Sequence, residues 1–302
     1  MKSTRAIDRR TLLKLVSSTS IIAMSILAFS PSIAAAAIDI SHKIKIAGDL
    51  RMFTQRMALS AAFVMLDVEK DHYLNVLREE YAEFESDIAA LRTGDSNYAM
   101  EPEQNKLVLE AINTVEFGWK ALSPELKAVI ETGAVDEAQF TKIEKTNTLV
   151  MTLADSLIHR ILLEYKEEIP LGLAYQIDVV GTQRTLSQKM IKEAILVALG
   201  FDVEAHHEML TGSVQLFQFG LDKLAGQMQH NGQILPTPSE EISKQLSKAK
   251  HCWAKLQPIL EKLDQSHQVS PDEVQELAKE ADDMLAAFDV MSDVLIKEAE
   301  LV

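Results

Sequence analysis

IKIAGDLRMFTQRM at residues 44–57 and IDVVGTQRTLSQKM at residues 177–190 are two versions of one phrase. Aligned at an offset of 133 residues, they share a glycine, an arginine, a glutamine and a methionine. The matched pairs are Gly48 and Gly181, Arg51 and Arg184, Gln55 and Gln188, and Met57 and Met190. An internal repeat means that each copy is one structural unit, so the fold has to be read from two related halves.

The similarity between the halves extends well beyond this phrase. WKALSPEL at residues 119–126 returns as WAKLQPIL at residues 253–260, now at an offset of 134. Further matched pairs are Phe84 and Phe217, Leu91 and Leu224, and Asp155 and Asp289. These matches occur in the same order along the chain, and they predict two units at residues 38–168 and 169–302.

Apolar residues at the start of the first unit have the spacing of an amphipathic helix. They are Ile46, Leu50, Phe53, Met57, Ala61, Val64 and Val68. Alternating runs typical of strands are almost absent. We expect helices near residues 40–68, 71–93, 103–131, 136–167, 171–200, 202–228, 239–264 and 271–300. Four helices with short loops in each unit predict an all-α protein of two tandem up-down four-helix bundles.

Proline and capping residues refine the expected helix ends. Residues 237–240 (TPSE) and 270–273 (SPDE) both have the pattern of a capping box with proline at the first helical position. Pro124 and Pro258 occupy matched places inside the third expected helix of each unit. Because proline has no amide hydrogen and its ring clashes with the preceding turn, we expect a kink or a break at both.

Residues 1–37 have the pattern of an N-terminal export signal. Basic residues precede an apolar stretch at residues 12–29, and Ala34–Ala37 is a small-residue run suited to signal peptidase. Arg9–Arg10 resembles the twin-arginine signal, with an ordinary secretory signal or an uncleaved membrane anchor as alternatives. No later stretch is apolar for long enough to span a bilayer. We therefore expect a periplasmic protein whose mature form has no membrane span.

The chain is strongly acidic, with a net charge of −15. Residues 1–37 hold five of the 30 Lys and Arg residues and one of the 45 Asp and Glu residues, so the remainder has 25 against 44, a net charge of −19. Such a surface argues against nucleic acid and anionic membrane as partners. An anionic ligand would need a local cluster of donors, which makes the arginines of the repeated phrase the exceptions of interest.

Few residues suggest metal or redox chemistry. Cys252 is the single cysteine, which excludes an intramolecular disulfide, and we expect it to be buried and inert. Glu204 and His207 form one Glu-x-x-His, but the di-iron bundle motif needs a second copy. We expect His206 and His207 on a solvated helix face. The sequence therefore predicts no cofactor, no metal site and no enzymatic activity.

The repeated phrase forms a second face on its helix. At roughly 100° per residue, Gly48, Arg51 and Gln55 lie away from the apolar stripe. Glycine inside a helix costs about 1 kcal/mol relative to alanine, which suggests close approach of another helix or a ligand. Arginine offers a planar fork of donors suited to an oxyanion, and glutamine adds an amide donor.

Two arrangements of this face remain open. If the first helices of the two units meet across a pseudo-two-fold axis, Arg51 and Arg184 could converge on one anion, and a homodimer using one unit could do the same. The alternative is an ordinary helix contact in which the arginine pairs with carboxylates.

The segments IAGDLRMFTQRMA and VVGTQRTLSQKMIKEAILVALG resemble the motif of the PilJ/NarX-like N-terminal domain family. This domain occurs in type IV pilus chemotaxis transducers and in nitrate/nitrite sensor kinases, as a periplasmic four-helix bundle. The resemblance covers the chain after the signal, twice. It implies that Arg51 and Arg184 bind an anion between first helices, with Gly48 and Gly181 allowing backbone approach. Gln55 and Gln188 complete the expected ligand-binding set.

The two copies depart from the family pattern at specific positions. The asparagine common three residues before the glycine is Lys45 in the first copy and Asp178 in the second. Thr185 replaces the methionine present as Met52. If only one copy binds ligand, we expect it to be the copy with Arg51.

Three functions follow from these observations. The leading hypothesis is a periplasmic sensory module for a small anion such as nitrate or nitrite, which signals through a partner protein or membrane sensor. The second is a structural or protein-interaction bundle that has lost ligand binding. The third, an exported enzyme or redox carrier, has no catalytic constellation to support it.

Overall fold

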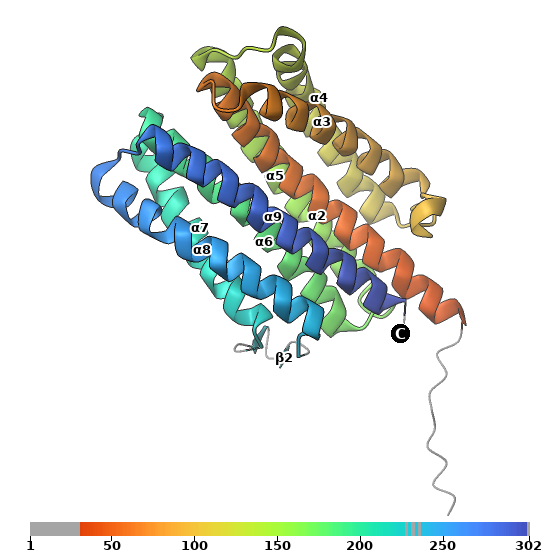
Figure 1. Ribbon diagram of the computed structural model, residues 1–302. Helices are drawn as coiled ribbons and strands as arrows, with labels where there is room; N and C mark the ends of the chain where they lie inside the picture. Colours follow the sequence, from red (N-terminus) through yellow and green to blue (C-terminus); the bar gives the residue numbers. More distant parts are fainter. Residues whose placement is uncertain (1–30, 227–228, 231–232, 235–236, 301–302) are drawn as a thin grey trace, which may run out of the picture.

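A computed structural model describes residues 31–226, 229–230, 233–234 and 237–300 (Figure 1). Most of the predicted export signal therefore lies outside the described residues and stays a prediction. The run Ala34–Ala37 forms part of the first helix. Within the described residues, no helix is long and apolar enough to cross a membrane.

The described chain consists almost entirely of long helices, as predicted. They are α2 (Pro31–Met65), α3 (Lys70–Thr93), α4 (Lys106–Thr132), α5 (Glu137–Glu164), α6 (Leu171–Leu199), α7 (Val203–Leu224), α8 (Glu240–Ser266) and α9 (Pro271–Ala299). A short 3₁₀ helix, η1 (Ser96–Tyr98), precedes α4. Two-residue strands β1 (Gln229–His230) and β2 (Gln233–Ile234) pair antiparallel between α7 and α8.

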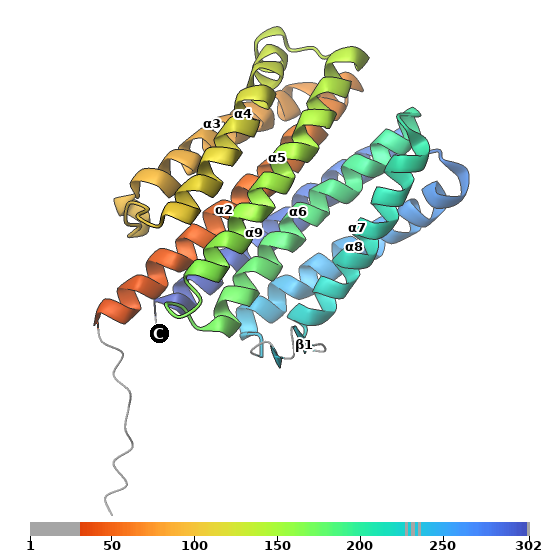
Figure 2. The ribbon, with the colours of Figure 1, turned by 180° about the vertical axis from the view of Figure 1, so that it is seen from behind.

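The helices form two up-down four-helix bundles, α2–α5 and α6–α9 (Figures 1 and 2). The first helices of the two bundles, α2 and α6, pack side by side and run in the same direction at the centre of the molecule. On one flank of this pair, α9 packs against both α2 and α6. The prediction of two tandem bundles is thus confirmed, and their first helices form the joint between them.

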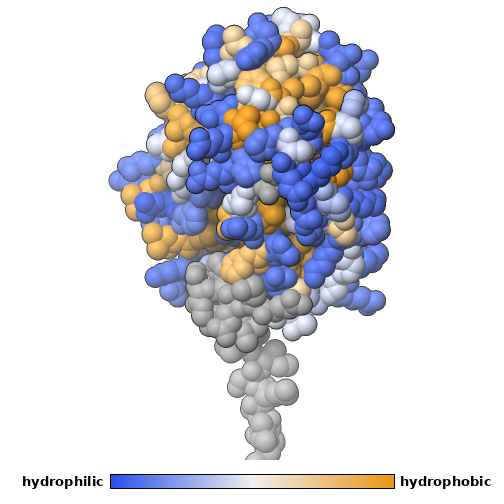
Figure 3. All heavy atoms as spheres, turned by 90° about the vertical axis from the view of Figure 1, so that its left-hand side faces the viewer, coloured by the Kyte–Doolittle hydropathy of each residue, from blue (hydrophilic) through white to orange (hydrophobic). Residues whose placement is uncertain are grey.

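Residues matched in the repeat form equivalent cores. Phe84 stacks on Trp119 in the first bundle, with ring centroids 4.1 Å apart. Phe217 packs on Trp253 in the second, with centroids 5.3 Å apart. Each pair joins the second helix of a bundle to the third. Hydrophilic side chains cover most of the face seen in Figure 3, with apolar patches between them.

Local signals predicted the helix ends with mixed success. Ser270 forms the expected capping box with Glu273. The predicted box at residues 237–240 is wrong, because α8 begins at Glu240 with Ser239 as its N-cap. Pro124 and Pro258 lie inside α4 and α8 without breaking them.

Candidate functional site

The two bundles meet where α2 crosses α6 at Gly48 and Gly181. A Cβ on Gly48 would lie 3.9 Å from the Cα of Gly181, and the reverse distance is also 3.9 Å. A Cβ on Gly181 would lie 3.5 Å from Nη2 of Arg51. These are ordinary contact distances, so alanine would fit at either position. The second face is therefore a helix–helix contact, but the contact does not force glycine.

Arg51 reaches from α2 to two of its neighbouring helices, α5 and α6. Its Nη1 donates to Oδ1 of Asp155 on α5 at 2.6 Å. Its Nη2 donates to Oγ1 of Thr182 at 3.0 Å and to Oδ1 of Asp178 at 3.4 Å, both on α6. The side chain is 8% exposed, and its Nε has no hydrogen-bond partner in the described structure.

Arg184 makes the corresponding contacts from α6. Its Nε donates to Oδ1 of Asp289 on α9 at 2.6 Å. Its Nη1 donates to Oδ1 of Asp49 on α2. Lys45 lies one turn before Asp49 and forms an ion pair with it at 3.0 Å.

The contacts of the two arginines follow the repeat. Asp155 and Asp289 are matched residues, so each arginine binds the same aspartate of its own bundle. Thr182 matches Asp49, so each arginine also binds the residue after the glycine on the opposite helix. A pseudo-two-fold relation therefore places the arginines on opposite flanks of the α2–α6 pair.

The departures from the family pattern supply charge to this network. Asp178 adds a second carboxylate to Arg51, and Lys45, at the matched position, adds a cation to Asp49. Burial raises the pKa of Asp49, but Arg184 and Lys45 more than offset this effect and hold it below its usual value. Burial also opposes the charge of Arg184, yet its two aspartates hold its pKa above the ordinary range.

A cavity of about 380 Å³ opens beside Arg51 between α5, α6 and α7. Its lining includes the polar residues Arg51, Thr152, Asp155, Thr182, Thr185, Lys189 and Ser213, and the apolar residues Met151, Leu186, Met209 and Leu216. Arg184 does not line this cavity. The arginines therefore do not share one pocket, and only Arg51 lies beside this open space.

Lys189 brings a second cationic group to the cavity. Its Nζ donates to Oγ of Ser213 at 3.0 Å and lies 3.5 Å from Oε1 of Glu193. Burial lowers the pKa of this ammonium group, although Glu193 opposes the shift. The ammonium group interacts with these two neighbours, and Lys189 lines the same cavity as Arg51.

On the Arg184 flank, the position of Lys189 is occupied by Arg56, which forms two ion pairs. Arg56 Nε lies 2.9 Å from Glu80, and Nη1 lies 2.8 Å from Asp282. Glu80 stands at the position of Ser213. On this flank two carboxylates therefore lie beside the cation, where the other flank has the hydroxyl group of Ser213.

The two predicted glutamines lie one turn beyond the arginines and do not line the cavity. Gln188 accepts from Arg56 at 3.1 Å and donates to the carbonyl oxygen of Ala281 at 3.1 Å. Gln55 donates to Oγ1 of Thr54 at 3.2 Å, and its buried Oε1 has no hydrogen-bond partner in the described structure. In the described structure both glutamines thus bind protein groups.

A buried charged cluster beside the cavity was missed from the sequence. Lys192 Nζ lies 2.5 Å from Glu144 on α5 and 3.1 Å from Glu193 on α6. His206 Nδ1 lies 2.5 Å from the other oxygen of Glu193. The signal was present in QKMIKEA, where charges interrupt an apolar run directly after the repeated phrase.

The expectation that His206 lies on a solvated face is therefore wrong, because it is 7% exposed and faces Glu193. One ligand atom each from Glu144, Glu193 and His206 lie within 4.8 Å of one another, a spacing that suits a metal ion. The ammonium group of Lys192 already lies between the two carboxylates. The cluster thus joins the bundles through an internal cation.

Comparison with known families agrees with this architecture. The family model for the type IV pili methyl-accepting chemotaxis transducer N-terminal domain, PilJ, matches residues 39–142 and 170–281. The chain belongs to this family. It carries two tandem PilJ domains, one in each bundle, and is a transducer-type sensory module, which implies a partner that receives its signal. No curated protein matches the chain, and no solved structure does.

Proposed function

We propose that this tandem PilJ protein is a periplasmic sensory module that binds a small inorganic anion, of the nitrate or nitrite type, in the cavity beside Arg51. Binding of the anion is then signalled to a partner signalling protein or membrane sensor. Family membership supports the sensory role. The observation that carries the ligand site is that Arg51, at the joint between the bundles, lines a cavity together with Lys189.

The cavity provides the donors that a small oxyanion needs. A guanidinium fork binds a planar oxyanion through two parallel hydrogen bonds. Lys189 adds a second positive charge, and the hydroxyl groups of Thr182 and Ser213 lie beside the two cations. In a chain with a net charge of −15, such local donors must overcome long-range repulsion.

Asp155 acts as the internal competitor of the anion. Its carboxylate occupies Nη1 of Arg51 at 2.6 Å, and its side chain is 43% exposed. If the Asp155 side chain turned toward solvent, it would release Arg51 at a low cost in free energy, because a half-exposed carboxylate is readily hydrated. An anion that replaces the Asp155 carboxylate on Arg51 would remove this ion pair between α2 and α5. Ligand binding would thereby change the position of these two helices relative to each other.

Calorimetry with nitrate and nitrite tests this site. Asp155→Asn removes the competing charge and should tighten anion binding about tenfold, which corresponds to one strengthened charge-assisted hydrogen bond. The matched variant Asp289→Asn, beside Arg184, should leave the affinity unchanged. Arg51→Ala should abolish binding. Equal effects of the two asparagine variants, or binding that survives Arg51→Ala, would refute the site.

The same geometry favours a second candidate, a protein-interaction bundle without a ligand. Asp155 and Asp178 hold Arg51, and Asp49 and Asp289 hold Arg184, so the joint is already rich in carboxylates. If neither the natural protein nor Asp155→Asn binds nitrate or nitrite, this candidate replaces the first.

A further inference from the structure

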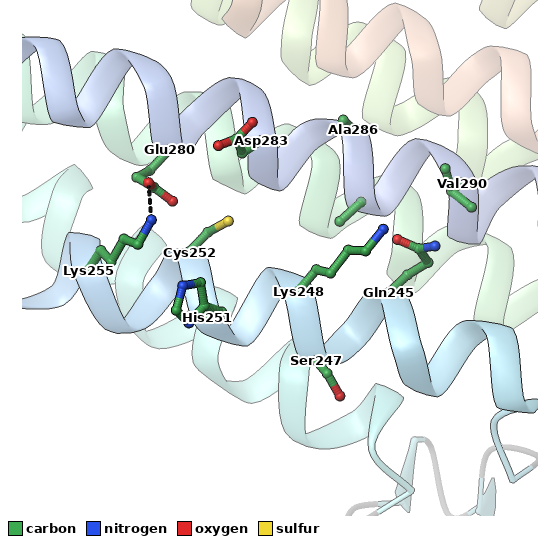
Figure 4. A pocket seen from close by; sticks show the side chains of 11 residues that line it. Gln245, Ser247, Lys248, His251, Cys252, Lys255, Glu280, Asp283, Ala286 and Val290 are labelled. Atoms are coloured by element: carbon green, nitrogen blue, oxygen red, sulfur yellow. Dashed lines mark hydrogen bonds and ion pairs between the residues drawn. The ribbon is translucent and has the colours of Figure 1, made fainter.

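A second cavity, of about 590 Å³, lies between α8 and α9 on the second bundle, and we call it the α8–α9 cavity (Figure 4). Its two walls carry opposite charges. Lys248, His251 and Lys255 line it from α8, and Glu280 and Asp283 line it from α9. None of the residues that line this cavity lines the cavity beside Arg51.

The first bundle lacks this charge pattern, although the helices correspond. At the offset of 134, the matched pairs are Gln245 and Ala111, Lys248 and Thr114, His251 and Phe117, Lys255 and Ala121, Glu280 and Thr146, and Asp283 and Leu149. Every polar lining position in this set is uncharged in the first copy. The charged walls thus belong to the second copy and do not follow from the bundle fold.

The first bundle also fills the corresponding space. Leu153 on α5 packs against Gly118 on α4 so tightly that a Cβ on Gly118 would lie 2.9 Å from its Cδ1. The second copy has Cys252 and Ala287 at these positions. Because alanine is much smaller than leucine, it leaves room between the helices. Both residues line the α8–α9 cavity.

Two buried acceptor oxygens in this cavity have no hydrogen-bond partner in the described structure. Oε1 of Glu280 accepts from Lys255 at 2.6 Å and from Lys279 at 3.1 Å, whereas its buried Oε2 has no hydrogen-bond partner among the described residues. Oε1 of Gln245 is likewise unpartnered, and that residue is 4% exposed. Buried acceptors without a donor cost free energy, which indicates a missing donor. Figure 4 shows Gln245 and Lys248 extending from α8 toward α9.

We propose that the α8–α9 cavity binds a small zwitterion of the free α-amino acid type. Its ammonium group donates to Glu280 Oε2 at one end of the cavity, and its carboxylate accepts from Lys248. Cys252, Ala287 and their neighbours provide an apolar surface for an aliphatic side chain. The volume lies in the usual range of small-molecule sites. This ligand is chemically distinct from the anion proposed at Arg51, so the protein would bind two different ligands at separate sites.

Calorimetry on the whole protein tests this assignment, with L-leucine, L-methionine and L-glutamine as probes. Each is compared with its N-acetyl derivative, which lacks the ammonium group, and its amide, which lacks the carboxylate. We expect at least one free amino acid to bind and both of its derivatives to bind at least about tenfold more weakly. No binding by any of the three, or equal binding of a derivative, would overturn the proposal.

Matched variants locate the site. Lys248→Met should weaken binding about tenfold, whereas Lys250→Met, on the same helix but outside the cavity lining, should not. The double variant Cys252→Gly with Ala287→Leu imports the residue pair that closes the first bundle and should abolish binding. Circular dichroism checks that it folds. Amino acid binding should also survive Arg51→Ala, which separates this site from the proposed anion site. An equal loss of affinity in the two lysine variants, or amino acid binding by a folded double variant, would refute the α8–α9 cavity as the binding site.

Discussion

Replacing Arg184 by alanine should destabilise the protein more than the matched replacement of Arg51, although both arginines belong to one repeated phrase. The two guanidinium side chains are equally buried, at 7% and 8% exposure. Their carboxylate partners differ. Each arginine binds one aspartate that is 43% exposed, Asp289 for Arg184 and Asp155 for Arg51. The second partner of Arg184, Asp49, is 9% exposed, whereas the second partner of Arg51, Asp178, is 18% exposed and lies farther away, at 3.4 Å.

The exposure of the carboxylate left behind sets the magnitude. Removing one partner of a buried ion pair costs about 3–5 kcal/mol when the remaining charge is uncompensated. Lys45 still lies beside Asp49 in Arg184→Ala, so we expect the lower end of this range, about 3 kcal/mol. A half-exposed pair contributes only about 0–1 kcal/mol, because the carboxylate regains water. Arg51→Ala also loses its bonds to Thr182 and Asp178, each worth about 1 kcal/mol. We therefore expect the two variants to differ by about 1 kcal/mol.

Urea denaturation followed by circular dichroism at pH 7 measures this difference. The pKa of Asp49 in the folded protein lies below its usual value, so its ion pair stabilises the fold above about pH 4 and this contribution is lost as the pH falls through the lowered pKa. The gap between the variants should therefore narrow below about pH 4. Equal losses at pH 7, or a larger loss for Arg51→Ala, would show that carboxylate burial does not control the energetics of the joint.

Three further predictions concern single residues. Burial and Glu280 raise the pKa of the Cys252 thiol to about 12, so Ellman's reagent at pH 8 should modify it far more slowly in the folded protein than in urea. Burial and the charge of Asp49 raise the pKa of Asp87 to about 8. Protonated Asp87 therefore favours the folded state, and this contribution is fully present below the unfolded pKa and is lost as the pH rises through 8. Asp87→Asn should accordingly have a higher melting temperature than the natural protein at pH 9 but not at pH 4. Gly48→Ala should stabilise the fold by about 0.5–1 kcal/mol in urea denaturation, because alanine favours the helix and its methyl group meets α6 at 3.9 Å; a loss of stability would mean that the crossing does not admit it.

The repeat and the helical periodicity were sufficient to predict the two bundles, whereas the contact between their first helices was one of the arrangements that the sequence left open. Both are local or pairwise properties of the sequence, such as the spacing of Ile46, Leu50 and Phe53. The orientation of the arginines is different in kind. Whether Arg51 meets Asp155 or an anion depends on the distance between α5 and α6, which no motif on either helix encodes.

Two buried polar side chains illustrate the same limit. His206 is a polar residue on a surface-like stretch, and only the packing of α7 against α6 brings it to Glu193. Lys192 interrupts an apolar run, which was a usable signal, but its partner Glu144 is 48 residues away in the other bundle. Pairings between bundles cannot be read from periodicity, because each helix is compatible with several rotations about its axis.

Duplication explains why the two flanks of the joint differ. A symmetric pair of domains must place identical residues on both flanks, whereas a tandem chain can change one flank alone. Here the Lys189 flank has a hydroxyl partner, Ser213, and lines the cavity beside Arg51, whereas the Arg56 flank has Glu80 and forms ion pairs. These ion pairs stabilise the joint on one flank, which would leave Arg51 on the other flank able to exchange a carboxylate for the anion that we propose. In the proposed function, ligand binding and stabilisation of the joint therefore belong to different copies of the same arginine.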